Sequence, residues 1–347
     1  MPSRATLILA GGNAKRFQTK GQKWEDKALA KIAGKPLIVN LIQNISNTVD
    51  EVALCVNDEQ RKKKYLKILD KHSIKRVKFV VDQKNLPIKG PARAILSGLH
   101  AISADQYLIV PTDMPFLKPE VAEYMFSIAK GVDVVVPVWP DGRLETLLMI
   151  LERKNVTVIA ELLCLLNKPR VDTIIRGATR IFFVSPLKEI INIDKKLESF
   201  ININTKENLN KLESRSTIGN FTENQFIDRG KVPVEDLKLF SEGMKQLDIN
   251  NLKDSRDIFK TCRDRFEAKN IHFWAALSNE KLGETVLKLL NQQKAASEMY
   301  FEANEAYLRA SNNYNDEAKI YINKGCKFLG QVALADKTMC ESKAAIR

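Results

Sequence analysis

Short apolar runs alternate with amphipathic segments through the first 213 residues of the chain. Runs rich in Val, Ile and Leu predict strands, and segments whose apolar positions recur every three or four residues predict the helices between them. The predicted strands cover residues 5–10, 51–56, 77–81, 107–110, 132–138 and 180–184, and the predicted helices cover residues 37–45, 58–71, 92–102 and 119–129. In the highly charged helix 58–71, we expect Tyr65, Leu66 and Leu69 on the inner side. This alternation predicts an α/β fold with a doubly wound, mostly parallel sheet and right-handed crossovers.

A helical period without strands begins at Val234. The predicted helices cover residues 257–268, 273–282, 286–310 and 315–337, and the polar, glycine-containing segment 214–234 indicates a linker before them. We therefore expect one domain over residues 1–213 and an all-α domain over residues 235–347. Alanine, leucine and tyrosine recur in the second domain with a spacing that loosely resembles tetratricopeptide-type repeats, without a clean register of roughly 34 residues. An ordinary helical bundle and a repeat module for a protein partner or for self-association both stay open.

The composition narrows the class of protein. A chain of 347 residues with 44% hydrophobic content exceeds one average domain and can bury ordinary cores. It has no run of roughly 18 apolar residues, and it passes from Met1 into a strand without the apolar segment of a signal peptide. These features predict a cytoplasmic protein with no membrane partner. Five cysteines without a Cys-x-x-Cys pair, and three widely spaced histidines, argue against disulfides and against zinc or histidine-rich metal sites.

The positive charge is concentrated in the first domain. The formal net charge is +13, and residues 1–213 hold 34 of the 55 Lys and Arg residues but only 23 of the 42 Asp and Glu residues. An excess of this kind can attract nucleic acid. The densest run, Arg61 to Lys64, lies in a helical pattern without interleaved aromatic residues. We therefore expect a solvated helix face there, rather than a nucleic-acid-binding surface.

The first predicted strand runs directly into the sequence Leu-Ala-Gly-Gly at residues 9–12. Because glycine lacks a Cβ atom, Gly11 and Gly12 can adopt positive φ and bring backbone N–H groups against phosphate oxygens. Arg16 and Lys27 follow and can supply positive charge. The pattern is neither a P-loop nor the dinucleotide-binding fingerprint. It favours the binding of a triphosphate, although a simple turn and a surface lysine are the plainer interpretations.

Gly11, Asp82 and Asp113 each follow directly on a predicted strand. In an open parallel sheet, ligands bind outside the carboxyl ends of the strands, so we expect these three residues to lie together. A carboxylate at this edge suits Mg²⁺, which prefers one or two carboxylates together with phosphate oxygens and water. Asp113 stands before the stiff Met114-Pro115 turn and is the expected metal ligand, unless it only caps that turn.

Ordered motifs extend the pattern across the first domain. They are Leu-Ala-Gly-Gly at residues 9–12, Asp-Lys-Ala-Leu at 26–29, Gly-Lys-Pro-Leu at 34–37, Lys-Gly-Pro-Ala-Arg-Ala-Ile at 89–95, Pro-Thr-Asp-Met-Pro-Phe at 111–116 and Phe-Ile-Asn-Ile-Asn-Thr-Lys-Glu-Asn-Leu at 200–209. Together they resemble the signature of the nucleotidyltransferases that make activated sugars and cofactors. Within that superfamily the chain is most similar to the MobA-like molybdenum cofactor guanylyltransferases.

This resemblance implies a fold like that of the nucleotide-diphospho-sugar transferases. It implies a reaction in which GMP passes from GTP to molybdopterin, a phosphorylated small molecule, with release of pyrophosphate and with Mg²⁺ as cofactor. Lys27 and Arg16 are the implied catalytic cations, because positive charge stabilises the crowded phosphorus centre and the leaving pyrophosphate. Asp113 is implied to be both catalytic and the metal ligand.

The resemblance also implies binding residues for each substrate. The implied nucleotide-binding residues are Leu9, Ala10, Gly11, Gly12, Lys27, Asp82 and Gly90. Asp82 corresponds to the carboxylate that reads guanine, since it can accept from the N1–H and exocyclic amine edge. Asn202 and Asn204 are the implied acceptor-binding residues, unless they only start a helix before Glu207.

The chain departs from the family pattern in several places. Residues 17–25 lengthen the loop after the glycines, Ala92 and Ala94 replace a usual leucine and glycine, and Thr146 replaces a usual proline. These changes affect base and acceptor contacts more than the catalytic cations. Close alternatives are a cytidylyltransferase acting on the same pterin, a guanylyltransferase for cobinamide phosphate and a sugar-phosphate nucleotidyltransferase. An alternative of another class is an NTP-binding scaffold that serves the helical domain without turnover.

Overall fold

The chain divides into two compact units, residues 1–226 and residues 227–347. The computed structural model describes residues 2–12, 14–18, 21, 24–209, 217–293 and 297–345. The first residues of the predicted linker, 214–216, lie outside the described part of the chain. A short strand, β10 (Gln225–Asp228), lies within the predicted linker and spans the boundary between the two units.

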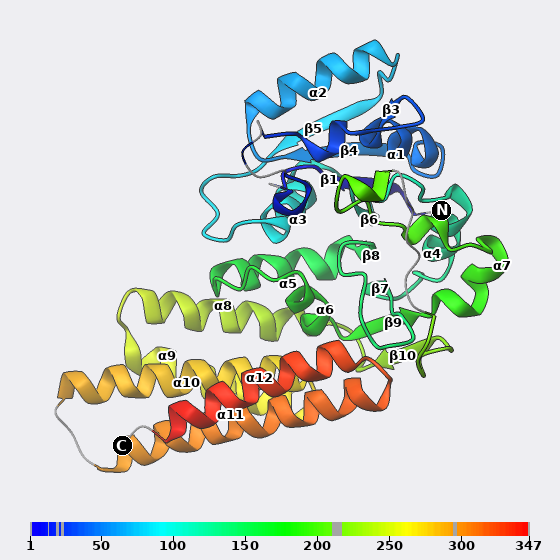
Figure 1. Ribbon diagram of the computed structural model, residues 1–347. Helices are drawn as coiled ribbons and strands as arrows, with labels where there is room; N and C mark the ends of the chain where they lie inside the picture. Colours follow the sequence, from blue (N-terminus) through cyan, green and yellow to red (C-terminus); the bar gives the residue numbers. More distant parts are fainter. Residues whose placement is uncertain are drawn as a thin grey trace. The chain divides into compact units, whose positions relative to one another are not determined.

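An eight-stranded sheet forms the frame of the first unit (Figure 1). In spatial order its strands are β10, β9 (Arg180–Val184), β7 (Val134–Pro137), β8 (Met149–Glu152), β6 (Gln106–Pro111), β1 (Arg4–Leu9), β4 (Glu51–Val56) and β5 (Val77–Val81). Parallel pairs join β1 with β4 and β6, β4 with β5, and β7 with β9. Strand β8 is antiparallel to both of its neighbours, β6 and β7. The predicted α/β class with a mostly parallel sheet is confirmed, whereas β8 was not predicted.

Helices and short turns connect these strands. The helices are α1 (Leu37–Ile45), α2 (Glu59–Lys71), α3 (Pro91–Ala101), α4 (Pro119–Ser127), α5 (Arg153–Leu165), α6 (Asp172–Gly177) and α7 (Ile191–Ile193). The single-turn elements are η1 (Lys15–Phe17), η2 (Lys27–Leu29), η3 (Pro186–Ile190), η4 (Glu198–Phe200) and η5 (Glu207–Leu209). A two-residue hairpin joins β2 (Lys31–Ile32) to β3 (Lys35–Pro36). Helices α1 to α4 lie close to their predicted positions.

Helix α2 begins with a side-chain cap, because the carboxylate of Asp58 accepts the backbone N–H of Arg61 at 2.7 Å. Tyr65 and Leu69 are buried as predicted, but Leu66 is 39% exposed. The prediction for Leu66 is wrong because residues four apart share a helix face, and the next residue along is rotated away from it.

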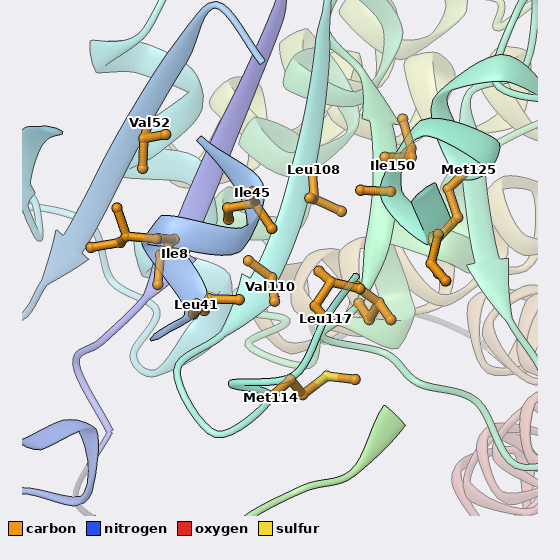
Figure 2. Packing of buried hydrophobic residues seen from close by; sticks show 14 of the residues in the cluster. Ile8, Leu41, Ile45, Val52, Leu108, Val110, Met114, Leu117, Met125 and Ile150 are labelled. Carbon is orange, nitrogen blue, oxygen red and sulfur yellow. The ribbon is translucent and has the colours of Figure 1, made fainter. Parts of the chain in front are cut away.

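The core beneath the sheet also anchors a turn of the candidate site. Figure 2 shows Leu41 and Ile45 of α1 packed in the same cluster as sheet residues such as Val110. Met114 and Leu117, in the turn that follows β6, belong to this cluster and are almost fully buried. Burial of a large apolar side chain contributes about 1.5–3 kcal/mol. These two side chains therefore fix the turn that carries Asp113.

The second unit is helical. Its helices are α8 (Val234–Asp248), α9 (Leu252–Ala268), α10 (His272–Gln293), α11 (Ser297–Asn323) and α12 (Lys327–Ala344). Trp274 of α10 packs against the rings of Phe240 and Phe266, with ring centroids 5.7 and 6.3 Å away. This aromatic cluster ties together α8, α9 and α10, and the predicted all-α class is confirmed.

Two predicted helix boundaries in this unit are wrong. A break was predicted between residues 282 and 286, but α10 continues through Gly283, where an added Cβ would lie 2.9 Å from the Tyr307 ring. The glycine thus serves close packing between α10 and α11. The predicted single helix 286–310 overlaps both α10 and α11, and its residues 294–296 lie outside the described residues. The predicted helix 315–337 is also divided, because Gly325 adopts a φ of 78° between α11 and α12.

The five cysteine side chains are buried. Burial raises the pKa of the thiols of Cys55 and Cys326, so these groups stay protonated and unreactive. None of the helices in the described part of the chain combines the length and the apolar character that a bilayer span requires.

Candidate active site

Two adjoining clefts open in the first unit, beyond the carboxyl ends of β1, β4, β5 and β6. The glycine cleft, of about 550 Å³, is lined by residues that include Gly11, Gly12 and Gly90. The asparagine cleft, of about 650 Å³, is lined by residues that include Asn202 and Asn204. Pro111, Asp113 and Leu147 line both clefts. Asp113 therefore lies at the border where ligands of the two clefts would meet.

The predicted site residues divide between these clefts. Every predicted nucleotide-binding residue lines the glycine cleft: Leu9, Ala10, Gly11, Gly12, Lys27, Asp82 and Gly90. Arg16, Asn202 and Asn204 line the asparagine cleft instead. The structure thus separates Arg16 from Lys27, although the sequence grouped them as cations on the same phosphates.

The loop after β1 lies close to the end of β4. The backbone N–H of Ala10 donates to the carbonyl oxygen of Cys55 at 2.8 Å. A Cβ atom added to Gly11 would lie 3.4 Å from the backbone nitrogen of Asn57, an ordinary van der Waals distance, so the loop packs against the residue that follows β4. The side chain of Asn57 also lines the cleft, and its Oδ1 is buried without a hydrogen-bond partner among the described residues. Sequence reasoning missed Asn57, although it follows the apolar strand β4 as Asp82 follows β5.

Positive φ was expected to be available at the glycine pair, but neither Gly11 nor Gly12 adopts it. The positive φ angles at the cleft belong to Ala14, with a φ of 45°, and to Gly90, with a φ of 75°. Gly90 stands directly before α3, in a conformation that residues with a Cβ rarely adopt. The tight turns of the cleft wall therefore lie at Ala14 and Gly90.

Lys27 and Asp113 form an ion pair at the border of the clefts. Lys27 Nζ lies 2.6 Å from Asp113 Oδ2, and the two side chains are only 15% and 17% exposed. Asp113 Oδ1 is buried and has no hydrogen-bond partner within the described part of the chain. A buried carboxylate oxygen without a donor calls for a ligand, and a cation is the ligand that suits it.

Asp82 follows β5, and its backbone N–H donates to the carbonyl oxygen of Val56 at 2.8 Å. Burial raises the pKa of its carboxyl group, while the nearby Arg93 guanidinium opposes the rise. Its Oδ1 is buried, again without a partner among the residues described. Arg93 also donates to the carbonyl oxygen of Leu86 at 2.9 Å, which holds the segment before Gly90. A carboxylate in this position can accept hydrogen bonds from a ligand that offers N–H donors.

The asparagine cleft is tied to the same turn as Asp113. The backbone N–H of Ile203, between Asn202 and Asn204, donates to the carbonyl oxygen of Asp113 at 2.9 Å. Ile203 itself is fully buried and belongs to a small cluster with Phe17. This contact places residues 202–204, which are far from Asp113 in sequence, beside the border of the clefts.

A short helix does begin after the asparagines, as the plainer interpretation held. Asn208 Oδ1 accepts the backbone N–H groups of Asn204 and Thr205 at 3.2 and 3.1 Å, and η5 follows. The side chain of Asn208 therefore accepts the backbone N–H groups at the start of this helix. The amide of Asn202 makes one long contact, 3.5 Å to the carbonyl oxygen of Phe200, and lines the cleft.

A buried pair braces the segment between β7 and β8. Trp139 Nε1 donates to Glu145 Oε1 at 2.7 Å, and the Trp139 ring packs edge-on against Phe200 at 5.4 Å between centroids. Because β8 is antiparallel to β6, the beginning of β8 lies at the edge where β6 ends. Thr146 and Leu147 therefore reach the clefts from the start of a strand.

The base of the longer loop at residues 17–25 is closed by one side chain. Gln18 Nε2 donates to the carbonyl oxygen of Glu25 at 2.9 Å, and Gln18 Oε1 accepts the N–H of Glu25 at 2.9 Å. Lys206 Nζ lies 2.7 Å from Glu25 Oε1 and links this base to the segment after Asn204. Residues 19, 20, 22 and 23 of the loop lie outside the described residues.

The predicted solvated face of α2 is wrong at Arg61, which is buried, although Lys63 and Lys64 are exposed. The guanidinium of Arg61 donates to the carbonyl oxygen of Ala10 at 3.0 Å, behind the glycine loop. The sequence signal was the four-residue spacing from Arg61 to buried Tyr65, which places both residues on one helix face. The prediction of a solvated face was based on the number of charges in the run and overlooked this spacing.

The donor set at the border fits Mg²⁺ bound together with a phosphate. Among the described residues, no group of three or more Asp, Glu, His or Cys side chains could hold a metal ion by itself. Asp113 offers a single carboxylate with an unpartnered buried oxygen. Mg²⁺ accepts one or two carboxylates when phosphate oxygens and water supply the remaining ligands.

Comparison with known proteins agrees with this architecture. The family described as MobA-like NTP transferase domain matches residues 6–181. A probable molybdenum cofactor guanylyltransferase of Methanosarcina mazei is 31% identical over 209 residues, which cover 60% of this chain and 89% of that protein. A protein of the same name from Thermococcus gammatolerans is 30% identical over 209 residues, covering 59% of this chain and 96% of its own length.

Solved structures are similar over the same part of the chain. The crystal structure of molybdopterin-guanine dinucleotide biosynthesis protein A from Archaeoglobus fulgidus covers 60% of this chain and 95% of its own, with 22% identity and a TM-score of 0.48. The match to the family extends over half of the chain, and the relatives are covered over most of their length. The chain therefore belongs to the MobA-like NTP transferase domain family and is a nucleotidyltransferase.

Proposed function

We propose that this nucleotidyltransferase transfers GMP from GTP to molybdopterin, with release of pyrophosphate. The observation that carries the proposal is the shared border of the two clefts, where Asp113 lines both and pairs with Lys27 at 2.6 Å. Two substrates that react with one another need adjoining sites with charge at the point of reaction. The relatives named as probable molybdenum cofactor guanylyltransferases support the choice of substrates.

The glycine cleft is proposed to hold GTP. The backbone at residues 9–12 and the ammonium group of Lys27 would contact the phosphates, since both line this cleft. Asp82 would accept hydrogen bonds from the N1–H and the exocyclic amine of guanine, and its buried unpartnered oxygen supports this role. Gly90 would let the backbone before α3 approach the nucleotide.

The asparagine cleft is proposed to hold the acceptor. Arg16 is exposed and lines this cleft, so its guanidinium is available to an acceptor phosphate. Asn202 and Asn204 offer amide groups that both donate and accept, which suits a heterocycle with polar edges. Ile203 holds these amides beside the border through its bond to Asp113.

In the proposed reaction, an oxygen of the acceptor phosphate attacks the α-phosphorus of GTP in line with the departing group. A new phosphorus–oxygen bond forms, the bond between the α-phosphorus and the α,β-bridging oxygen breaks, and pyrophosphate leaves with the electron pair. No protein nucleophile is needed, because the acceptor phosphate is already ionised. The protein acts by holding the two substrates in line and by neutralising charge with Lys27.

Asp113 is proposed to hold Mg²⁺ through the oxygen that has no partner among the described residues. When bound there, Mg²⁺ supplies positive charge to the phosphate oxygens. Lys27 then shares the remaining carboxylate oxygen of Asp113 and keeps the ammonium group at the border of the clefts. The lysine is thereby oriented before the substrates arrive.

The proposal is tested by measuring pyrophosphate release with Mg²⁺ and each ribonucleoside triphosphate in turn. Each reaction contains molybdopterin, cobinamide phosphate or a sugar phosphate as acceptor. We expect release only with GTP and molybdopterin. Pyrophosphate release with CTP or with another acceptor would contradict the proposed substrates but support the proposed reaction class. Tight NTP binding without pyrophosphate release from any acceptor would indicate a binding scaffold.

The Asp82→Asn variant is expected to lose its preference for GTP. Its amide nitrogen would face the donors of guanine, and loss of a hydrogen bond to a charged group is worth about 1.5–3 kcal/mol, or roughly 10- to 100-fold in kcat/KM. Activity with the other nucleotides in the same variant is the internal control. A GTP preference that survives this change would exclude Asp82 as the base-reading residue.

The raised pKa of Asp82 adds a dependence on pH. Protonation removes the acceptor, so we expect KM for GTP to rise as the pH falls through the pKa of this group, sooner than an ordinary aspartate would allow. Bound guanine favours the ionised form, so binding in this range releases a proton. KM for GTP in buffers from neutral to mildly acidic checks this, and the Asp82→Asn variant should lack the rise.

A further inference from the structure

We propose that Arg61 and Tyr65 of α2 are positioning residues that hold two phosphate-binding segments at a fixed spacing. The segments are the glycine loop at residues 10–12 and the turn that carries Lys27. The inference rests on the proposed function, because it assumes that the glycine cleft takes a nucleoside triphosphate. Neither side chain lines that cleft. Both would act through the backbone that does.

Arg61 is bound to two carbonyl groups of the glycine loop. Its Nη1 donates to the carbonyl oxygens of Ala10 at 3.0 Å and Gly12 at 3.2 Å. In a trans peptide the carbonyl and the following N–H point in opposite directions, so this contact turns the N–H of Gly11 away from α2. The guanidinium also occupies two carbonyl oxygens whose partial negative charge would otherwise oppose a phosphate.

The same helix holds the turn before Lys27. The carboxylate of Asp26 accepts the backbone N–H of Ala28 at 3.3 Å, which caps the turn η2. That carboxylate also accepts the hydroxyl of Tyr65, at 3.0 and 3.1 Å to its two oxygens. Arg61 Nε lies 3.8 Å from the same group. One face of α2 is therefore joined to both segments.

The network lies away from solvent. The side chains of Arg61 and Asp26 are 9% and 5% exposed, and the ring of Trp24 lies 5.3 Å from the Arg61 guanidinium carbon. Burial and the adjacent Asp26 raise the pKa of the Tyr65 hydroxyl, which keeps it a donor. Removing one member of a buried charged pair leaves its partner uncompensated, so Arg61 and Asp26 hold one another in this arrangement. Catalysis by positioning depends on such fixed geometry.

The Arg61→Ala variant tests the inference in the full-length protein. We expect the dissociation constants of GTP and of inorganic pyrophosphate, measured by calorimetry with Mg²⁺, to rise about tenfold or more, with the acceptor KM unchanged. Pyrophosphate carries no base, so it reports on the phosphate segments alone. Added guanidinium ion, far below the concentration that unfolds the protein, should restore part of the lost affinity, and sodium chloride at equal ionic strength should not.

Lys63→Ala is the matched control, because Lys63 lies two residues away on α2, carries the same charge and is exposed. It should bind pyrophosphate as the unaltered protein does. An equal loss of affinity in Lys63→Ala would overturn the inference, because the effect would then be one of overall charge. Unchanged pyrophosphate affinity in folded Arg61→Ala would overturn it as well.

Tyr65→Phe keeps the proposal testable if Arg61→Ala does not fold, because it removes only a hydroxyl group. We expect kcat to fall several-fold, since the turn of Lys27 loses the hydrogen bond from Tyr65 to Asp26, with a smaller change in acceptor KM. A kcat equal to that of the unaltered protein would contradict the positioning role. If the unaltered protein bound neither GTP nor pyrophosphate, the proposed function itself would fail, and this inference with it.

Discussion

The Lys27→Ala variant is expected to lose nucleotidyl transfer, with kcat reduced on the order of 10²- to 10³-fold. Lys27 Nζ lies at the border of the two clefts, 2.6 Å from Asp113. In the proposed reaction, negative charge would develop there on the phosphates as pyrophosphate departs, and an alanine could not neutralise it. The measurement is the initial rate of pyrophosphate release with saturating GTP, molybdopterin and Mg²⁺.

Lys31→Ala is the control for this variant. Lys31 lies four residues further on in the same lysine-rich stretch, but its side chain is exposed and lines neither cleft. It should retain full activity, and both variants should retain a cooperative thermal transition. A near-normal kcat in Lys27→Ala would contradict the catalytic role assigned to this lysine.

The Asp113→Asn variant is expected to be inactive even at saturating Mg²⁺. Asparagine preserves the shape of the side chain and can still accept from Lys27, so the turn fixed by Met114 and Leu117 should stay folded. It removes the negative charge that a hard cation requires. We expect a loss in kcat of at least about 100-fold, together with weaker Mg²⁺ dependence of GTP binding, measured by calorimetry with and without the metal.

Asp70→Asn provides the comparison, because Asp70 is exposed on α2 and lines neither cleft. Its rate and its Mg²⁺ titration should match those of the unaltered protein. If Asp113→Asn kept the metal dependence of the unaltered protein, the metal would have to be held elsewhere. The role assigned to Asp113 at the border would then be wrong.

The sequence predicted the parallel part of the sheet because most positions in strands such as β1, β4 and β6 are apolar. It also predicted that Gly11, Asp82 and Asp113 lie at one edge of the sheet, because each follows a predicted strand. The structure lines the glycine cleft with all three. Their chemical roles stay predictions, which the variants described above test.

Strand β8 shows where this reasoning stopped. The rule that ligands bind at the ends of strands applies to parallel strands, and β8 runs the other way. Thr146 and Leu147 reach the clefts because they precede β8. Nothing in a short, mostly apolar segment such as β8 reveals the direction of its strand, so sequence alone could not place these residues.

Arg61 and Gly283 illustrate a second limit. A charged residue on a charged helix suggests a solvated face, and a glycine suggests a break. Both interpretations fail where tertiary contacts use the residue, at the loop carbonyls for Arg61 and at the ring of Tyr307 for Gly283. Local composition carries no information about such partners.

The wall that the two clefts share also bears on what happens after the reaction. Pro111, Asp113 and Leu147 line both clefts, so a dinucleotide product would occupy both at once. Its halves are joined covalently, and a joined ligand gains the contacts of two sites while losing the freedom of only one molecule. The arrangement proposed to bring the substrates together would therefore also slow the release of the joined product.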